Sequence, residues 1–276
     1  MRYIVILLLM IAMPAWATPA QGFGLLSSKK EPVEVSADAG IEWRRQENIF
    51  IAKGNAQVKS GNVILEAAEL RALYRTASQN SKKNDLGGME IYRFEAVGPV
   101  TITSPDGVVK GGHAYYDVDQ AVAVVSGDNV SLTAGSAEVN AGSQLEYWQE
   151  RKIAVARGGA RVRQGGQALN ATTLVGEFKE GRDGLRLSLV RAEGQVAVIT
   201  KDGVARANQG EYDLTADKAR LIGNVRLTQG SNELRGDEAV VDMQSGISSL
   251  VAKGGGRVKG LFVPKPQAPA QLAPMS

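Results

Sequence analysis

Apolar and polar residues alternate around seven glycines that recur along most of the chain. Their spacings are 44, 29, 31, 36, 29 and 31 residues, and the two long spacings contain polar insertions at 76–85 and 179–184. The residues four and two positions before each glycine are apolar in every copy, and apolar pairs two residues apart follow most of them. Such period-2 alternation predicts β-strands with one buried face. The seven phase glycines are Gly54, Gly98, Gly127, Gly158, Gly194, Gly223 and Gly254.

A second apolar run follows each phase glycine at a nearly fixed distance. It begins eleven residues after the glycine in most copies and twelve residues after Gly127, as a single inserted residue would produce. Turn-forming sequences such as Ser60-Gly61-Asn62 and Gly165-Gly166 separate the two runs. Each unit is therefore expected to be strand, tight turn, strand, turn. The alternative is an ordinary glycine-rich β-sandwich with chance regularity, which the shared offsets of the units argue against.

The two ends of the chain differ from the repeat region. Arg2, the apolar run 3–13 and the site Ala15-Trp16-Ala17 predict an export signal cleaved after Ala17. An uncleaved membrane anchor is the alternative, although the run is shorter than the roughly 20 apolar residues a membrane span needs. We expect a flexible leader at 18–30, a repeat domain at 31–263 and a proline-rich disordered tail at 264–276.

The composition narrows the chemistry. The chain has no cysteine and one histidine, so disulfides, thiolate metal sites and multi-histidine metal sites are excluded. Without Arg2 the formal net charge is +2, from 31 basic and 29 acidic residues, too low for nucleic-acid binding. The carboxylates near the second strands follow no fixed offset, which argues against an acid/base pair. We expect no cofactor and no enzymatic activity.

Several segments together resemble the OstA-like domain of the LptA family. They are Pro32-Val33-Glu34-Val35-Ser36-Ala37-Asp38, Ala52-Lys53-Gly54-Asn55-Ala56-Gln57-Val58, Leu65-Glu66-Ala67-Ala68-Glu69-Leu70 and the ending Arg257–Pro264. The resemblance covers about residues 31–264. It implies an all-β fold: an elongated, bent antiparallel β jelly roll, open-ended and repeat-built, with about 14–16 strands. Family members have about half as many units as this chain.

The same resemblance implies a function and a set of partners. In the family the fold carries lipopolysaccharide across the periplasm, between an LptC-like inner-membrane anchor protein and an LptD-like outer-membrane protein. The open edges at Val33–Ala37 and Val258–Val263 allow head-to-tail self-association. The alternatives are a structural β-solenoid of the cell envelope that binds no lipid and, less favoured, a carbohydrate-active enzyme.

An apolar inner face would suit the proposed cargo. Exposing an acyl chain of about a dozen carbons to water costs on the order of 10 kcal/mol, so such a chain needs a shielded path. Plain core packing is the alternative for each residue taken singly. The residues predicted to line the lipid-binding groove are Val33, Val35, Val58, Leu65, Val100, Ile102, Val130, Leu132, Val162, Leu169, Val196, Val198, Val225, Leu227 and Leu234.

Overall fold

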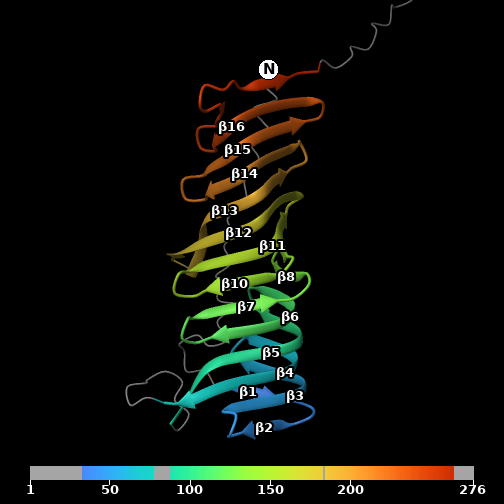
Figure 1. Ribbon diagram of the computed structural model, residues 1–276, viewed down its shortest axis with the longest axis vertical. Coiled ribbons are helices and arrows are strands. Elements are labelled where there is room, and N and C mark those ends of the chain that lie inside the picture. Colours follow the sequence, from blue (N-terminus) through green and yellow to red (C-terminus); the bar gives the residue numbers. More distant parts are fainter. Residues whose placement is uncertain (1–32, 78–87, 183, 264–276) are drawn as a thin grey trace, which may run out of the picture.

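The computed structural model describes residues 33–77, 88–182 and 184–263; the predicted signal, leader and tail lie outside these ranges. The described chain is all-β and antiparallel, with the strands stacked along one long axis (Figure 1). The strands are β1 (Val33–Ser36), β2 (Ile41–Arg44), β3 (Ile49–Ser60), β4 (Val63–Thr76), β5 (Met89–Ser104), β6 (Gly107–Asp117), β7 (Val122–Ser126), β8 (Val130–Ala134), β9 (Ala137–Ala141), β10 (Gln144–Trp148), β11 (Ile153–Gln164), β12 (Gln167–Gly181), β13 (Gly184–Ile199), β14 (Val204–Asp213), β15 (Lys218–Gln229), β16 (Asn232–Asp242), β17 (Ile247–Val251) and β18 (Lys259–Leu261).

The long strands bend midway, and the bend divides the sheet into two walls. Wall A contains β2, β7, β10, β17 and the halves of the long strands that pair in line with them. Wall B contains β1, β8, β9, β18 and the other halves. Each wall holds fourteen strands or strand halves, so thirteen steps of about 4.8 Å give an axis of about 62 Å. The predicted bent, open-ended jelly roll is confirmed.

The phase glycines lie at the corner between the walls. All seven have positive φ, from 62° to 139°, a region that side chains disfavour. The strand register shifts beside most of them, for example between Val97 and Val100 around Gly98. A Cβ on Gly98 would come within 2.7 Å of the Ala68 Cβ on the neighbouring strand. Glycine is therefore needed at this corner for both its conformation and its small size.

The eighteen strands exceed the predicted 14–16. The corners after Gly127 and at Gly142-Ser143 interrupt the ladder, so two bent strands each appear as a pair: β7 with β8, and β9 with β10. The end strands are split in the same way, since β1 and β2 pair with the two halves of β3, and β17 and β18 with the two halves of β16. Counting each of the four pairs as one bent strand gives fourteen. The one-residue insertion visible in the sequence after Gly127 lies at the break between β7 and β8.

The space between the walls holds one apolar core along the whole described stack. Wall A contributes mostly small residues near the corner, such as Ala52, Ala96 and Ala192. Wall B contributes branched aliphatic residues such as Ile102 and Leu227. Because these positions alternate with exposed polar residues, the interior of the fold is apolar and its outer surface is polar and charged.

Candidate functional site

Wall B carries an unbroken inner row of apolar residues from one end of the stack to the other. Its members face one another across successive strands, and most are partly or fully buried. A row of this kind offers continuous apolar surface along the axis. The row consists of Val35, Val58, Leu65, Ile102, Val109, Leu132, Val139, Val162, Leu169, Val198, Ala205, Leu227 and Leu234.

Most residues predicted to line a groove lie inside the fold. All of them except Val33 and Val35 belong to the core or pack against it. Val100, Val130, Val196 and Val225 form a deeper row beside the corner, each at most 2% exposed. Val33 and Val35 lie on the edge strand β1 and are 48% and 42% exposed. They therefore stand at an open end of the interior. Whether any of these residues contacts lipid remains a prediction.

Wall A has a second inner row, which the sequence prediction missed. It runs along the open side of the wall, farther from the corner than the small residues, and contains both aromatic and smaller residues. We call this row the aromatic lip. Its members in register order are Trp43, Phe50, Ala72, Phe94, Tyr116, Ala123, Tyr147, Ala154, Gly176, Val190, Tyr212, Ala219 and Val241. Aromatic side chains beside the row extend it, since Tyr74 packs against Phe50 and Phe178 against Tyr147.

Polar atoms of the aromatic lip reach the hairpin turns. The Tyr212 hydroxyl donates to Asp217 Oδ1 at 2.9 Å, and the Tyr116 hydroxyl donates to Gln149 Oε1 at 2.9 Å. Burial and the hydrogen bond with Asp217 raise the pKa of the Tyr212 phenol, so the hydroxyl stays neutral. Each of these two tyrosine rings therefore extends from the core to the hairpin turns, with its apolar ring inside and its hydroxyl at the edge.

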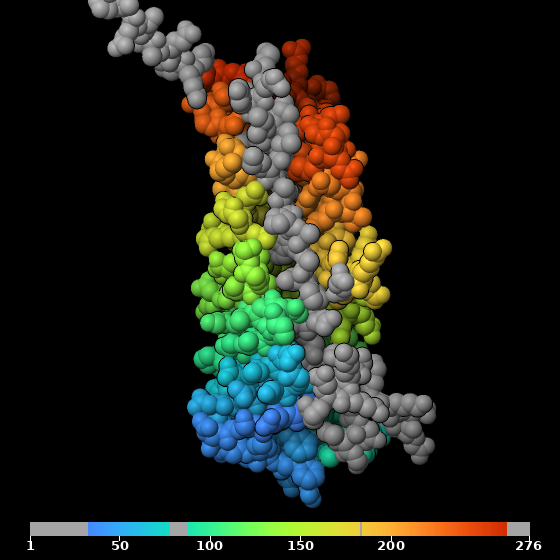
Figure 2. All heavy atoms as spheres, turned by 180° about the vertical axis from the view of Figure 1, so that it is seen from behind, coloured from blue at the N-terminus to red at the C-terminus, as the bar shows by residue number. Residues whose placement is uncertain are grey.

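Within the described ranges the chain passes between walls A and B at the corner side. Among the described strands every ladder pairs strands of the same wall, so no backbone pairing closes the opposite side. In the yellow-to-red part of Figure 2, the described atoms form two columns side by side along the long axis. We call the boundary between the two rows of hairpin turns the seam.

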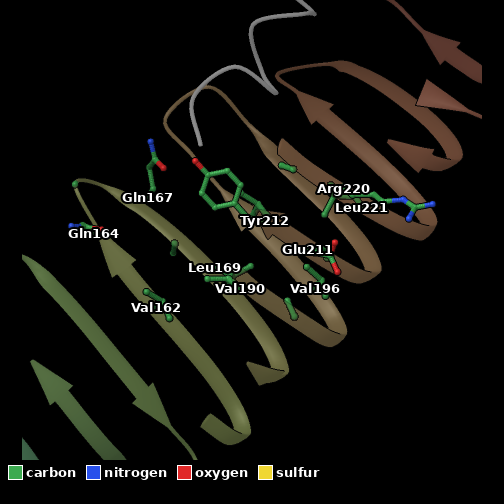
Figure 3. Close-up of a pocket in the computed structure, with 16 residues that line it drawn as sticks. Val162, Gln164, Gln167, Leu169, Val190, Val196, Glu211, Tyr212, Arg220 and Leu221 are labelled. Carbon is green, nitrogen blue, oxygen red and sulfur yellow. The ribbon is translucent and has the colours of Figure 1, made fainter. Parts of the chain in front are cut away.

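A cavity of about 220 Å³ lies between the walls in the C-terminal half (Figure 3). Val162, Leu169 and Val198 of wall B line it together with Ala192 and Tyr212 of wall A. Its volume is below the roughly 300–1,000 Å³ of most small-molecule pockets. A guest as large as an acyl chain would therefore have to part the walls.

The rim of this cavity is polar on the wall B side. Gln164 and Gln167 flank the turn at Gly165-Gly166, and Figure 3 shows them on the same side of the cavity as the Tyr212 ring. The buried Oε1 atom of Gln164 accepts no hydrogen bond from the described residues. This carbonyl can accept a hydrogen bond from a hydroxyl or amide of a guest.

Exposed apolar side chains gather at the two ends of the stack. In the described ranges, the large apolar residues most open to solvent all lie on or beside β1, β2, β17 and β18. They are Val33, Val35, Ile41, Trp43, Ile247, Val251, Val258, Leu261, Phe262 and Val263. Unpaired backbone groups at such edges can template a further strand.

On the outer surface of wall A, the carboxylates Glu146 and Glu238 are paired with basic side chains. Burial opposes ionisation of Glu146, but hydrogen bonds from Arg157, Trp148 and Gln144 outweigh it and lower the pKa of the carboxyl. Side-chain hydrogen bonds from Arg220 and Lys253 lower the pKa of Glu238 to about 2. Both carboxylates are therefore ionised and fully engaged at neutral pH.

The described ranges hold neither a cluster of side chains suited to a metal ion nor a helix suited to a membrane. No three histidine, cysteine, aspartate or glutamate side chains there are grouped so that they could ligate a metal ion. Nor do those ranges contain a helix with the length and apolarity to cross a bilayer. His113 lies on β6 next to Tyr115, with ring centroids 6.3 Å apart.

The chain is similar to one family of known proteins and to a solved structure. A family model described as the LptA/(LptD N-terminal domain) LPS transport protein matches the chain twice, at residues 34–152 and 138–247. No curated protein sequence matches the chain. Among solved structures, LptH of Pseudomonas aeruginosa, described as the LptA homologous periplasmic component of the lipopolysaccharide transport device, is 15% identical, with a TM-score of 0.20. The match covers 86% of this chain and 99% of that one.

Proposed function

Because the chain belongs to the LptA/LptD N-terminal domain family of lipopolysaccharide transport proteins, we propose that it is a periplasmic carrier that shields lipopolysaccharide acyl chains between walls A and B. The family match spans residues 34–247 in two overlapping copies, so one chain contains two domain lengths in one continuous sheet. The proposed role is transport without catalysis, which is consistent with the family.

The observation that carries the proposal is the unbroken apolar row of wall B beneath an unpaired seam. The row runs in register from Val35 on β1 to Leu234 on β16, without a charged residue at any step. An acyl chain lying on this row is removed from water over its whole length, worth about 0.8 kcal/mol for each buried methylene. A lipid can therefore move along the row without losing its shielding.

Entry of the lipid requires the walls to separate at the seam. The corner is held by continuous backbone, whereas the described strands of the two walls form no backbone ladder with each other at the seam. Acyl chains would enter between the aromatic lip and the wall B row. The tyrosine hydroxyls and the Gln164 carbonyl would then face the polar headgroup, which stays outside.

The two open ends suit partners that extend the sheet. We propose that an LptC-like inner-membrane anchor protein and an LptD-like outer-membrane protein pair with the edges near β1 and β18, and that copies of the chain can pair head to tail. Val35 at one end and Leu261 at the other are exposed apolar residues on such edges. Strand addition would join the wall B rows of neighbouring domains into one longer path.

Site-specific photo-crosslinking tests the carrier role. A photoreactive residue at Ile102 or Val198, which face the interior, should capture lipopolysaccharide in detergent-free buffer. The same residue at Thr103 or Ala197, which neighbour them in sequence and face outward, provides the matched control. Equal capture at inner and outer positions, or capture at neither inner position, would contradict the proposal and favour a structural β-solenoid.

A further inference from the structure

The outer face of wall B carries a line of positive charge in the C-terminal part of the stack. Arg206 on β14 is in register with Arg226 on β15, Arg226 with Arg235 on β16, and Arg235 with Lys259 on β18. All four side chains are exposed, and the neighbouring residues Ala205, Val225 and Leu227 are buried. Four neighbouring strands of wall B therefore present four cations outward in one line. We call this line the basic stripe.

Like charges directly opposite each other on adjacent strands destabilise a sheet. Glu233 is the acidic residue on this face that relieves the repulsion, since it forms ion pairs with Arg226 and Arg235. Arg206 and Lys259 have no ion-pair partner among the described residues. The stripe therefore keeps a net excess of positive charge.

Wall A shows that the same strands can arrange their charges differently. There Arg191 on β13 is in register with Glu211 on β14, and Glu211 with Arg220 on β15. The signs alternate, and Arg191 forms an ion pair with Glu211 while Arg220 forms one with Glu238. The stacking of like charges on wall B is thus a local feature, not a general property of these strands.

The basic stripe is also confined to one end of wall B. In the N-terminal half the same outward row contains Gln57, Glu66, Thr101, Lys110 and Ser131, with one residue of each sign. At the C-terminal end the row lies next to an exposed apolar residue, because Leu261 is 61% exposed and shares the outer face of β18 with Lys259. Basic side chains beside exposed apolar ones are typical of surfaces that bind anionic membranes.

We propose that the basic stripe docks the C-terminal end of the protein on an anionic phospholipid membrane surface. Because neighbouring strands lie about 4.8 Å apart, the cationic groups of the stripe would meet lipid phosphates along one line, and Leu261 would enter the interfacial region. This docking is separate from the interior between the walls, and neither requires the other. It would fix which end of the chain lies at a membrane.

Vesicle co-sedimentation of the mature full-length protein tests the proposal. The probes are vesicles of phosphatidylglycerol with phosphatidylethanolamine, and vesicles of phosphatidylcholine alone. The variant Arg206→Gln/Arg226→Gln should bind the anionic vesicles roughly 30-fold more weakly, because each basic residue near an anionic surface contributes about fivefold. Wild-type binding should weaken at 0.5 M salt and be absent with phosphatidylcholine.

The control variant is Lys59→Gln/Lys110→Gln, which removes the same charge from exposed residues on the N-terminal half of the same wall face. It should bind the anionic vesicles like the wild type. Equal weakening in both variants would reduce the effect to net charge, and unchanged binding of the stripe variant would overturn the proposal. If the stripe substitutions instead abolish self-association in light scattering, with vesicle binding intact, the occupant is a second copy and the proposal is wrong.

Discussion

Replacing the corner glycine Gly98 with alanine should destabilise the fold more than the same change at Gly254. Both glycines are phase glycines with positive φ, 95° and 62°, so a Cβ costs about 1–2 kcal/mol at either position. At Gly98 the new Cβ would also lie 2.7 Å from the Ala68 Cβ, whereas no atom lies within 4 Å of a Cβ at Gly254. Relieving that contact by a backbone shift costs about 1–3 kcal/mol more.

The total for Gly98→Ala is therefore about 2–5 kcal/mol, against about 1–2 kcal/mol for Gly254→Ala. In a domain of this size 1 kcal/mol lowers Tm by about 2–4 °C, so thermal unfolding followed by far-ultraviolet circular dichroism can separate the two variants. If both variants lose the same Tm, close approach of the two strands does not shape the corner. The explanation that the small size of Gly98 allows the chain to bend at the corner between the walls would then be wrong.

Three further predictions concern the core packing, the ion pairs of Glu238 on the outer surface and the seam. Leu227→Ala, at a wall B position that is 5% exposed, should cost about 2–5 kcal/mol in chemical unfolding, and a cost below 1 kcal/mol would mean that the interior is loosely packed. Glu238→Gln should lower Tm above pH 4.5 and have progressively less effect as the pH falls towards 2. The pKa of Glu238 is lower in the folded than in the unfolded protein, so its ionised carboxylate stabilises the fold above the unfolded pKa of about 4.5, and this stabilisation is lost as the pH falls through the folded pKa of about 2. A Tm difference that stays constant across a pH series would refute this. Tyr212→Phe removes the hydrogen bond to Asp217, so it should lower the free energy of unfolding by only about 1 kcal/mol. It should also weaken the retention of lipopolysaccharide by the folded protein. Retention equal to that of the wild type would exclude a role for the hydroxyl at the seam.

The repeat and the inward-facing register of wall B could be predicted from the sequence. Phase glycines recur because each marks the same corner, and the apolar pairs that follow them, such as Val100 and Ile102, form the inner rows of wall B. Period-2 alternation fixes which side of a strand is buried, so the prediction needed only the position of the glycine.

The aromatic lip of wall A was harder to predict, because it depends on pairing between strands. Phe50 and Phe94 precede phase glycines by four residues, while Tyr116 and Tyr212 close second strands, so they occupy different positions in the repeat. Only the register brings them into one row. The large residues that close several second strands were a visible signal of this row.

Net charge concealed the basic stripe. The chain carries nearly equal numbers of acidic and basic residues, and the cations of the stripe are at least nine residues apart in sequence. They meet because β14, β15, β16 and β18 pair in register. Composition describes the average surface, whereas a charged line arises only from the fold.

The distance between the walls at the seam, with and without lipopolysaccharide, tests most directly whether a guest occupies the interior. The chain has no cysteine, so spin labels can be attached to single cysteines placed at Ser231 on the wall B turn between β15 and β16 and at Thr215 on the wall A turn between β14 and β15. Pulsed electron paramagnetic resonance should show this distance increasing when lipopolysaccharide binds, while a control pair at Thr215 and Gln149, both on wall A turns, stays unchanged. A seam distance that is the same in the free and the saturated protein would contradict a lipid path between the walls.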